Sequence, residues 1–342
     1  MTLMQADALQ APSTSGHGDP GNAIVRPPQR RNADDWVYAQ LFLSPELSSR
    51  DLVPAADEIL FDILAPLFAA WKAQGHTWFF IRYQEHGYHL RLRVHAESAM
   101  HRARIKVRLS SALAAPLARG AQLRFAKYEP EIDKYCGPHG NSLAEQHFCA
   151  SSVVSLRILA DDSTPLTERA LRLLASTLET TGLDAAQSIS WCRAYYDYWW
   201  RAFGLPPAYE QKDEAMFQHS RGAIASKFSA AQQAGTDGSP RNIAWLHDWT
   251  RALKQDIHAL KDLEGGRVLV DPIRQRDSAH TCYPYPVTDL SMLPNFWHML
   301  CNRLGVSVRQ EMQLVYCLMR HLTVQHGIEP TPMTMSLISD KT

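Results

Sequence analysis

The sequence lacks the features that would tie it to a membrane, a metal or an oxidising compartment. No stretch approaches the roughly 20 apolar residues that span a bilayer, and the N-terminus has no apolar core of a signal peptide. The six cysteines are scattered, without a Cys-x-x-Cys pair or a His pair at zinc-finger spacing. Such cysteines are typical of reduced thiols, so we expect a soluble cytoplasmic protein.

The chain of 342 residues also lacks an excess of charge. Its 35 Lys and Arg balance 35 Asp and Glu, which argues against direct nucleic-acid binding and against a polybasic membrane anchor. Lysine is scarce, because 9 Lys stand beside 26 Arg. Genome composition is the ordinary cause of such a bias, but Arg is also the side chain that holds carboxylates with two prongs. Where the arginines lie is therefore the useful question.

The common catalytic and nucleotide-binding motifs are absent from the sequence, namely GxGxxG after a strand, the P-loop, HExxH and GxSxG. Composition instead divides the chain into three parts. Residues 1–34 are rich in Pro, Gly and Ser and are expected to form a disordered tail. Residues 35–326 are expected to form a single unit, and residues 327–342 a loose tail.

The predicted fold class is α+β. Within the unit, residues 35–137 form an N-terminal sheet part and residues 138–326 a mainly helical part. The sheet part has the order β-α-β-β-α-β, which is that of a ferredoxin-like sheet layer. Its strands are predicted near residues 36–43, 77–83, 88–95 and 121–129, and its helices near 49–74 and 97–117.

Proline and glycine positions refine these boundaries. Pro66 is expected to kink the first helix. The segments 235–240 and 267–289 are rich in turn-forming residues and are predicted as loops. The helices of the second part are predicted near residues 142–159, 166–180, 185–203, 209–233, 243–263, 294–304 and 308–324.

The third predicted strand carries the sharpest chemical signal. Alternation along residues 89–95 places the aliphatic residues on one face and His89, Arg91, Arg93 and His95 on the other. Between residues 76 and 108, six Arg, one Lys and five His face only two acids. A solvated face paired with surface acids is one interpretation. A pocket in which Arg forks hold carboxylates is the other.

A second segment, residues 128–137, contains acids close to those cations. Glu129 and Glu131 share one side of an extended chain, and Lys134 follows at a turn. The acids could orient the strand cations or transfer a proton. An ordinary salt bridge at a strand end is the simpler interpretation.

A third segment, residues 295–303, contains a histidine on a predicted helix. His298 and Asn302 lie one turn apart, and Arg303 is adjacent. A core histidine is the simpler interpretation, because its neighbours are apolar. As a functional group, His298 would suit general acid or base chemistry near neutral pH.

These segments, in this order, resemble the C-terminal elimination domain of class I lantibiotic dehydratases. The family includes stand-alone members known as thiopeptide-type bacteriocin biosynthesis proteins. The resemblance extends over about residues 36–325. It is carried by residues 78–83, 89–93, 128–137, 144–148 and 298–304.

The resemblance implies a reaction on a precursor peptide with a leader. In the family, glutamate from glutamyl-tRNA is esterified to Ser or Thr, and the elimination domain expels it to leave dehydroalanine or dehydrobutyrine. A separate glutamylating dehydratase subunit is implied as a partner, and no metal or organic cofactor is implied. The residues in the family's elimination-site positions are Arg91, Arg93, Glu131, Lys134 and His298. The residues expected to bind substrate around them are Arg82, His89, Glu129, Asn302 and Arg303.

Two positions depart from the family pattern. Its Arg-Tyr-Gly-Gly reads Lys134-Tyr-Cys-Gly137 here, and an acidic residue is replaced near Ser151-Ser152. Some stand-alone relatives are pyridine synthases, which join two dehydroalanines in a formal 4+2 cycloaddition and expel the leader peptide. Glutamate elimination, pyridine synthesis and a non-catalytic leader-peptide-binding subunit therefore stand as three hypotheses.

Overall fold

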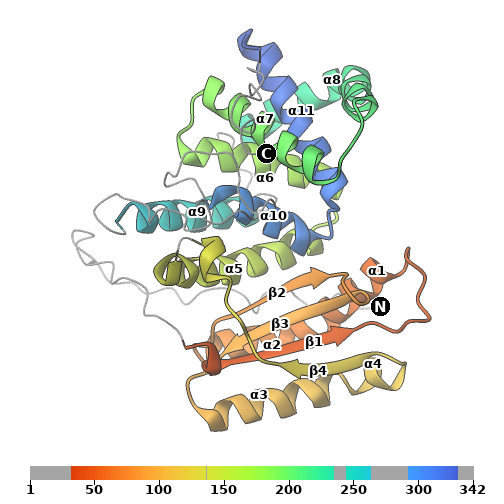
Figure 1. Cartoon of the computed structure of the whole chain (residues 1–342), viewed down its shortest axis with the longest axis vertical. Coiled ribbons are helices and arrows are strands. Elements are labelled where there is room, and N and C mark those ends of the chain that lie inside the picture. The colour runs from red at the N-terminus through yellow and green to blue at the C-terminus, as the bar shows by residue number, and fades with distance from the viewer. Residues whose placement is uncertain (1–31, 136, 235–243, 263–291, 330–342) are drawn as a thin grey trace, which may run out of the picture.

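The computed structural model describes residues 32–135, 137–234, 244–262 and 292–329 (Figure 1). A small four-stranded antiparallel sheet is followed by a mainly helical remainder, which confirms the α+β class. The predicted loops at 235–240 and 267–289, like most of both predicted tails, lie outside the described residues. None of the described helices is both long and apolar enough to cross a membrane.

The sheet has the strand order β2-β3-β1-β4, and each neighbouring pair is antiparallel. Its strands are β1 (Trp36–Phe42), β2 (Trp78–Tyr83), β3 (His89–His95) and β4 (Gln122–Ala126). All four lie where they are predicted, but β4 ends three residues early. Beyond it, Tyr128 turns into the core, and Pro130 has no N–H for a strand ladder.

Four helices and one irregular turn connect the strands. They are α1 (Leu52–Glu58), the π-helical turn η3 (Ile59–Leu64), α2 (Ala65–Ala73), α3 (Ala99–Ala112) and α4 (Ala114–Ala118). The irregularity expected at Pro66 falls in the turn before it, where the Ala65 N–H bonds to the Leu60 carbonyl. Proline has no N–H and crowds the carbonyl four residues earlier, so a wider turn relieves the contact.

The remainder is built from seven described helices. They are α5 (Gly137–Ala160), α6 (Leu166–Thr181), α7 (Ala185–Ala202), α8 (Ala208–Ala234), α9 (Ala244–Asp262), α10 (Leu293–Leu304) and α11 (Val308–His326). Capping boxes at Asp184 and Ser307 start α7 and α11. In Figure 1, α5 lies along the side of the sheet opposite α3, and α6, α7, α8 and α11 lie farthest from it.

The two faces of the sheet pack against different helices. We call the face with Leu90, Leu92 and Val94 the outer face; its core is shared with α1, η3, α2 and α3. We call the face with Arg91 and Arg93 the inner face; its aromatic residues pack with α5 and α10. The strand register confirms the alternation predicted for β3. Arg93 therefore lies among residues that pack under the helical part, whereas His89 and Arg91 contact the sheet and the hairpin between β2 and β3.

Candidate functional site

Arg93 lies on the inner face among three aromatic rings. Its guanidinium carbon is 4.7 Å from the Tyr38 centroid and 5.2 Å from those of Phe79 and Tyr128. Burial lowers the pKa of Arg93, while the two tyrosines and Glu131 act to raise it. The Arg93 Nε has no hydrogen-bond partner among the described residues. Arg93 is thus a half-buried cation with donor capacity to spare.

Arg91, two residues away on the same strand, is held in place by neutral groups. The His89 Nδ1–H donates to the Gly87 carbonyl at 2.8 Å, and the His89 Nε2 accepts from the Arg91 Nε at 3.1 Å. Burial lowers the pKa of His89, which keeps its imidazole neutral and able to accept. The Arg91 guanidinium carbon lies 3.3 Å from the centre of the Tyr83 ring. His89 is therefore placed to orient Arg91.

Glu131 and Lys134 lie at the short turn η4 (Ile132–Tyr135). The Lys134 Nζ is 3.6 Å from the Glu131 Oε2, and the two side chains are 29% and 63% exposed. The Tyr135 hydroxyl is buried and has no hydrogen-bond partner in the described part of the chain. Burial and the Glu131 charge raise the pKa of Tyr135, so this hydroxyl keeps its proton as a donor. Because the side chains of Lys134 and Glu131 are partly exposed, a ligand can reach both of their charges from solvent.

His298 of α10 pairs with a buried acid on α11. Its Nδ1 is 3.1 and 3.3 Å from the two carboxyl oxygens of Glu311. Burial and the Lys134 ammonium lower the pKa of His298 to about 4, and burial raises the pKa of Glu311 well above its usual range. At neutral pH the pair therefore holds one proton between imidazole and carboxyl. The Trp199 ring lies against the imidazole, with 5.0 Å between centroids.

The structure brings the five residues predicted as catalytic into one chain of interacting charges. The Arg91 and Glu131 charges both act on Arg93, Glu131 pairs with Lys134, and Lys134 acts on His298. A hollow of about 420 Å³ is lined by Pro130 and Ile132, the chain neighbours of Glu131, but not by the five residues themselves. Its lining residues are Asn32, Ala33, Pro130, Ile132, Pro138, Asn141 and Ser142. No group of three or more His, Cys, Asp or Glu suited to a metal ion occurs among the residues described.

Two of the predicted substrate contacts instead join α10 to the edge strand β2. The Arg82 side chain is 4% exposed, and it donates to Asp57 and to the Arg303 carbonyl. The Asn302 amide accepts from the Arg82 backbone N–H at 2.8 Å and donates to the Arg82 carbonyl at 2.7 Å. Arg82 and Asn302 therefore lie outside the chain of interacting charges formed by the five residues predicted as catalytic.

Arg303 is fully buried and has hydroxyl partners where the family pattern leads one to expect an acid. Its guanidinium donates to the Ser152 Oγ at 3.1 Å, to the Ser151 Oγ at 3.4 Å and to the Met299 carbonyl at 2.8 Å. Its Nη2 has no partner among the described residues. Burial and the Arg93 charge lower the pKa of Arg303 to about 9, and no carboxylate of a described residue pairs with the guanidinium to offset the lost hydration.

The fifth predicted substrate contact, Glu129, is exposed and makes no hydrogen bond or ion pair with a described residue. Sequence reasoning missed Tyr38 and Glu311 as site residues. Tyr38 follows from alternation on β1 once the register with Arg93 is known. Glu311 stands out only as an acid entering the apolar run of α11.

Tyr128 belongs to a motif that the sequence singles out, but its own role does not follow from sequence. Its hydroxyl donates to the Glu145 Oε1 at 3.0 Å, and the Asn141 amide donates to the same oxygen at 3.0 Å. Glu145 is 2% exposed. This buried carboxylate on α5 therefore fixes the ring that borders Arg93.

Comparison with known structures finds several with a similar fold. The tRNA-dependent lantibiotic dehydratase MibB from Microbispora sp. 107891 matches over 91% of this chain, with a TM-score of 0.52 and 20% identity. The chain spans only 28% of the length of MibB. No curated protein sequence matches the chain.

Two smaller proteins match over most of their own length. The pyridine synthase TbtD from thiomuracin biosynthesis has a TM-score of 0.63 and 13% identity, covering 86% of this chain and 100% of TbtD. TsrL has a TM-score of 0.62 and 18% identity, covering 86% of this chain and 96% of TsrL. At these identities the likeness concerns the fold. A family model described as "Lantibiotic biosynthesis dehydratase C-term" matches residues 36–322, and the chain therefore belongs to that family.

Proposed function

We propose that this protein eliminates glutamate from glutamylated Ser or Thr residues of a precursor peptide, leaving dehydroalanine or dehydrobutyrine. One observation carries the proposal. Arg91 and Arg93 lack carboxylate partners among the described residues, and they belong to the same chain of charges as the His298–Glu311 pair. Cations without a counter-charge suit a carboxylate ligand, and the pair suits proton transfer.

The charges of a glutamyl ester match those of the site. Once its α-carboxyl is esterified, glutamate still carries a side-chain carboxylate and an ammonium group. Arg93 and Arg91 offer guanidinium groups for the carboxylate, with Lys134 as a further cation. Glu131, which is 63% exposed, offers a carboxylate for the ammonium group.

In the proposed step, the reacting form is the one in which Glu311 is ionised. The His298 Nδ1–H then donates to the Glu311 carboxylate, and the free Nε2 takes the Cα proton of the esterified residue. The Cα–Cβ double bond forms as the Cβ–O bond breaks, and glutamate leaves as a carboxylate. The Glu311 carboxyl holds the His298 Nδ1 throughout. The unpaired Tyr135 hydroxyl is a donor for the enolate that develops on the peptide carbonyl.

The proposal extends to the assembly of the protein. The strand order β2-β3-β1-β4 supports a ferredoxin-like sheet layer, and we propose that residues 35–326 act as one unit. A separate subunit would supply the glutamylated peptide. Cys192, Cys301 and Cys317 are free thiols, which supports a reducing cytosol as the place of action.

The test is to offer the purified protein a glutamylated peptide and to measure free glutamate and the dehydrated peptide by mass spectrometry. We expect both products from the natural protein and almost none from Arg93→Gln. Arg124→Gln is the matched control, because Arg124 lies on the same sheet face but packs over Phe42 at the β4 edge. Equal losses in both variants, or no glutamate from the natural protein, would contradict the proposal.

A second candidate is pyridine synthesis, and two observations favour it. The chain matches the whole length of the pyridine synthase TbtD, and Arg303 has Ser151 and Ser152 in place of a carboxylate. The discriminating substrate is a peptide with two dehydroalanines. A released leader peptide would support cycloaddition. If neither glutamate nor a leader peptide is released, the result would favour a non-catalytic leader-peptide-binding subunit.

A further inference from the structure

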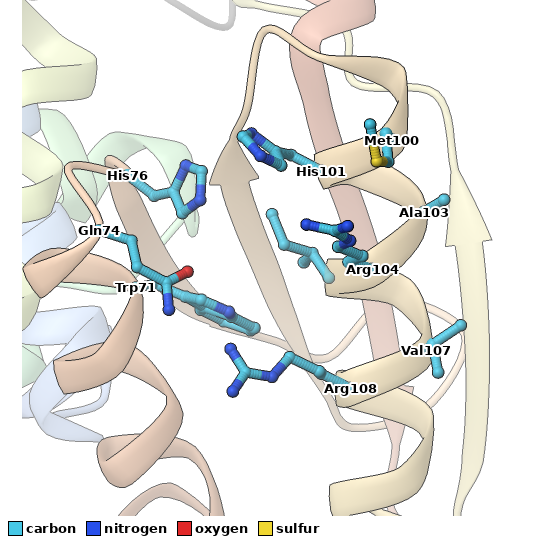
Figure 2. A pocket seen from close by; sticks show the side chains of 10 residues that line it. Trp71, Gln74, His76, Met100, His101, Ala103, Arg104, Val107 and Arg108 are labelled. Atoms are coloured by element: carbon cyan, nitrogen blue, oxygen red, sulfur yellow. The ribbon is translucent and has the colours of Figure 1, made fainter.

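A second cationic feature lies on the opposite side of the sheet, away from His298. A groove of about 810 Å³ runs between the end of α2 and the helix α3. Figure 2 shows Arg104 and Arg108 reaching from α3 toward α2, where Trp71 lies. The residues that line the groove are Trp71, Gln74, His76, Met100, His101, Ala103, Arg104, Ile105, Val107 and Arg108.

The charge of this groove is of one sign. Four of its ten lining residues are Arg or His, and none is acidic. Arg104 and Arg108 lie one turn apart on one face of α3, and both are exposed. Neither guanidinium forms an ion pair or a hydrogen bond with a residue that the structure describes. The helix α3 contains no Asp or Glu to balance them.

The remaining lining is largely apolar. Trp71 and Ile105 are buried at 1% and 3% exposure, whereas Met100 and Val107 are exposed by 59% and 66%. Cations beside exposed apolar side chains suit a peptide that alternates acidic and large apolar residues. Single-stranded RNA would need an exposed aromatic ring for stacking, and the one aromatic ring apart from the imidazoles, that of Trp71, is covered.

We propose that this groove binds an acidic, amphipathic segment of the precursor peptide, remote from the residues that react. The charge complementarity and the apolar rim carry the inference, and only the source of the peptide rests on the proposed function. Since the groove is on the outer side of the sheet, the protein can hold one part of its substrate there. Another part is then free to reach Arg91 and Arg93 on the inner side.

Fluorescence anisotropy with a labelled synthetic peptide of alternating Glu and Leu tests the proposal directly. We expect saturable binding that weakens as NaCl rises from about 0.05 M to about 0.5 M. The double variant R104E/R108E should bind about tenfold or more weakly, because two favourable contacts become repulsive. Both side chains are exposed, so the variant should unfold at the same denaturant concentration as the natural protein.

Lys106→Glu is the matched control. Lys106 is on the same helix, and its substitution changes the charge by as much as each of the two arginine substitutions. Its ammonium lies 5.4 Å from the centre of the Phe125 ring, and it does not line the groove. It should alter binding less than about twofold. An equal loss in both variants would reduce the effect to general electrostatics and overturn the proposal. Preferential binding of a Lys–Leu peptide, or of tRNA, would also overturn it.

Failure of peptide binding in the groove can be distinguished from failure of the proposed glutamate elimination. A short glutamylated peptide without acidic residues should be processed equally by the natural protein and by R104E/R108E. If no glutamate is released from any substrate while the acidic peptide still binds in the groove, the reaction fails and the groove stands as a peptide site. If glutamate is released but the acidic peptide does not bind, the groove proposal fails alone.

Discussion

The outer and inner faces of the sheet come from the same strands and differ in every property that matters for function. On the outer face, Leu90, Leu92 and Val94 are at most 1% exposed and belong to an apolar core. On the inner face, the alternating positions of β3 hold cations among aromatic rings. One face therefore provides stability, whereas the other holds two arginines that form no ion pair with a described residue.

The largest expected effect is on the inner side. His298→Gln should slow glutamate release by on the order of 10²–10⁴-fold, because it removes the proton acceptor while keeping a polar partner for Glu311. The measurement is single-turnover glutamate release, with denaturant unfolding as a check. If His298→Gln unfolds so readily that the unfolded fraction accounts for the slower release, His298 has a structural role instead.

The outer face should respond in the opposite way. Leu92→Ala should lower the free energy of unfolding by about 2–5 kcal/mol, since it opens a cavity against the helices of that face. The folded fraction should keep its rate of glutamate release. Urea unfolding monitored by circular dichroism, with activity normalised to folded protein, separates the two quantities. A slower glutamate release from the folded fraction would show that the outer face also contributes to the reaction.

The pH dependence of stability should report the single proton of the His298–Glu311 pair. His298 has its pKa lowered from 6.5 to about 4, so its contribution to stability is lost as pH falls from 6.5 toward 4. Glu311 has its pKa raised from 4.5, so its contribution is lost as pH rises above 4.5. Between these two ordinary values the two slopes cancel. Above about pH 6.5 the natural protein should lose stability until the folded-state pKa of Glu311 is reached.

Glu311→Gln should remove that loss at high pH. The difference in unfolding free energy between the natural protein and Glu311→Gln should fall by on the order of 1 kcal/mol per pH unit above pH 4.5, toward the raised pKa. Chemical unfolding over a pH series measures it. A pH-independent difference would mean that the Glu311 carboxyl is ionised in the folded protein.

The smallest effect is expected at Arg91. Arg91→Lys should lower kcat/KM for glutamate release about fivefold, because lysine keeps the charge but loses the forked contact and the stacking on Tyr83. His89→Phe should produce a similar loss, since it removes the acceptor that orients Arg91. Steady-state kinetics checks both. A complete loss of glutamate release in Arg91→Lys would indicate that Arg91 acts in the chemical step rather than in substrate binding.

The elements and the alternation on β3 could be predicted from sequence because both depend on local periodicity. The five residues predicted as catalytic lie together because the inner face and α10 meet, and here the resemblance supplied what periodicity cannot. The partnership of His298 with Glu311 and the aromatic surroundings of Arg93 depend on packing between distant segments. Arg82 and Arg303 could not be told from Arg91 by sequence alone, because their difference lies in which partners the fold brings to them.

The bonds from Asn302 and Ser152 to β2 have a consequence for solubility. An edge strand offers outward N–H and carbonyl groups to any extended chain it meets. Here the Arg82 N–H and carbonyl are taken up by the Asn302 amide, and the Phe80 N–H by the Ser152 Oγ at 3.3 Å. Two side chains thus occupy the positions that a foreign strand would need. A protein proposed to handle unfolded peptides is in this way prevented from adding one to its own sheet along β2.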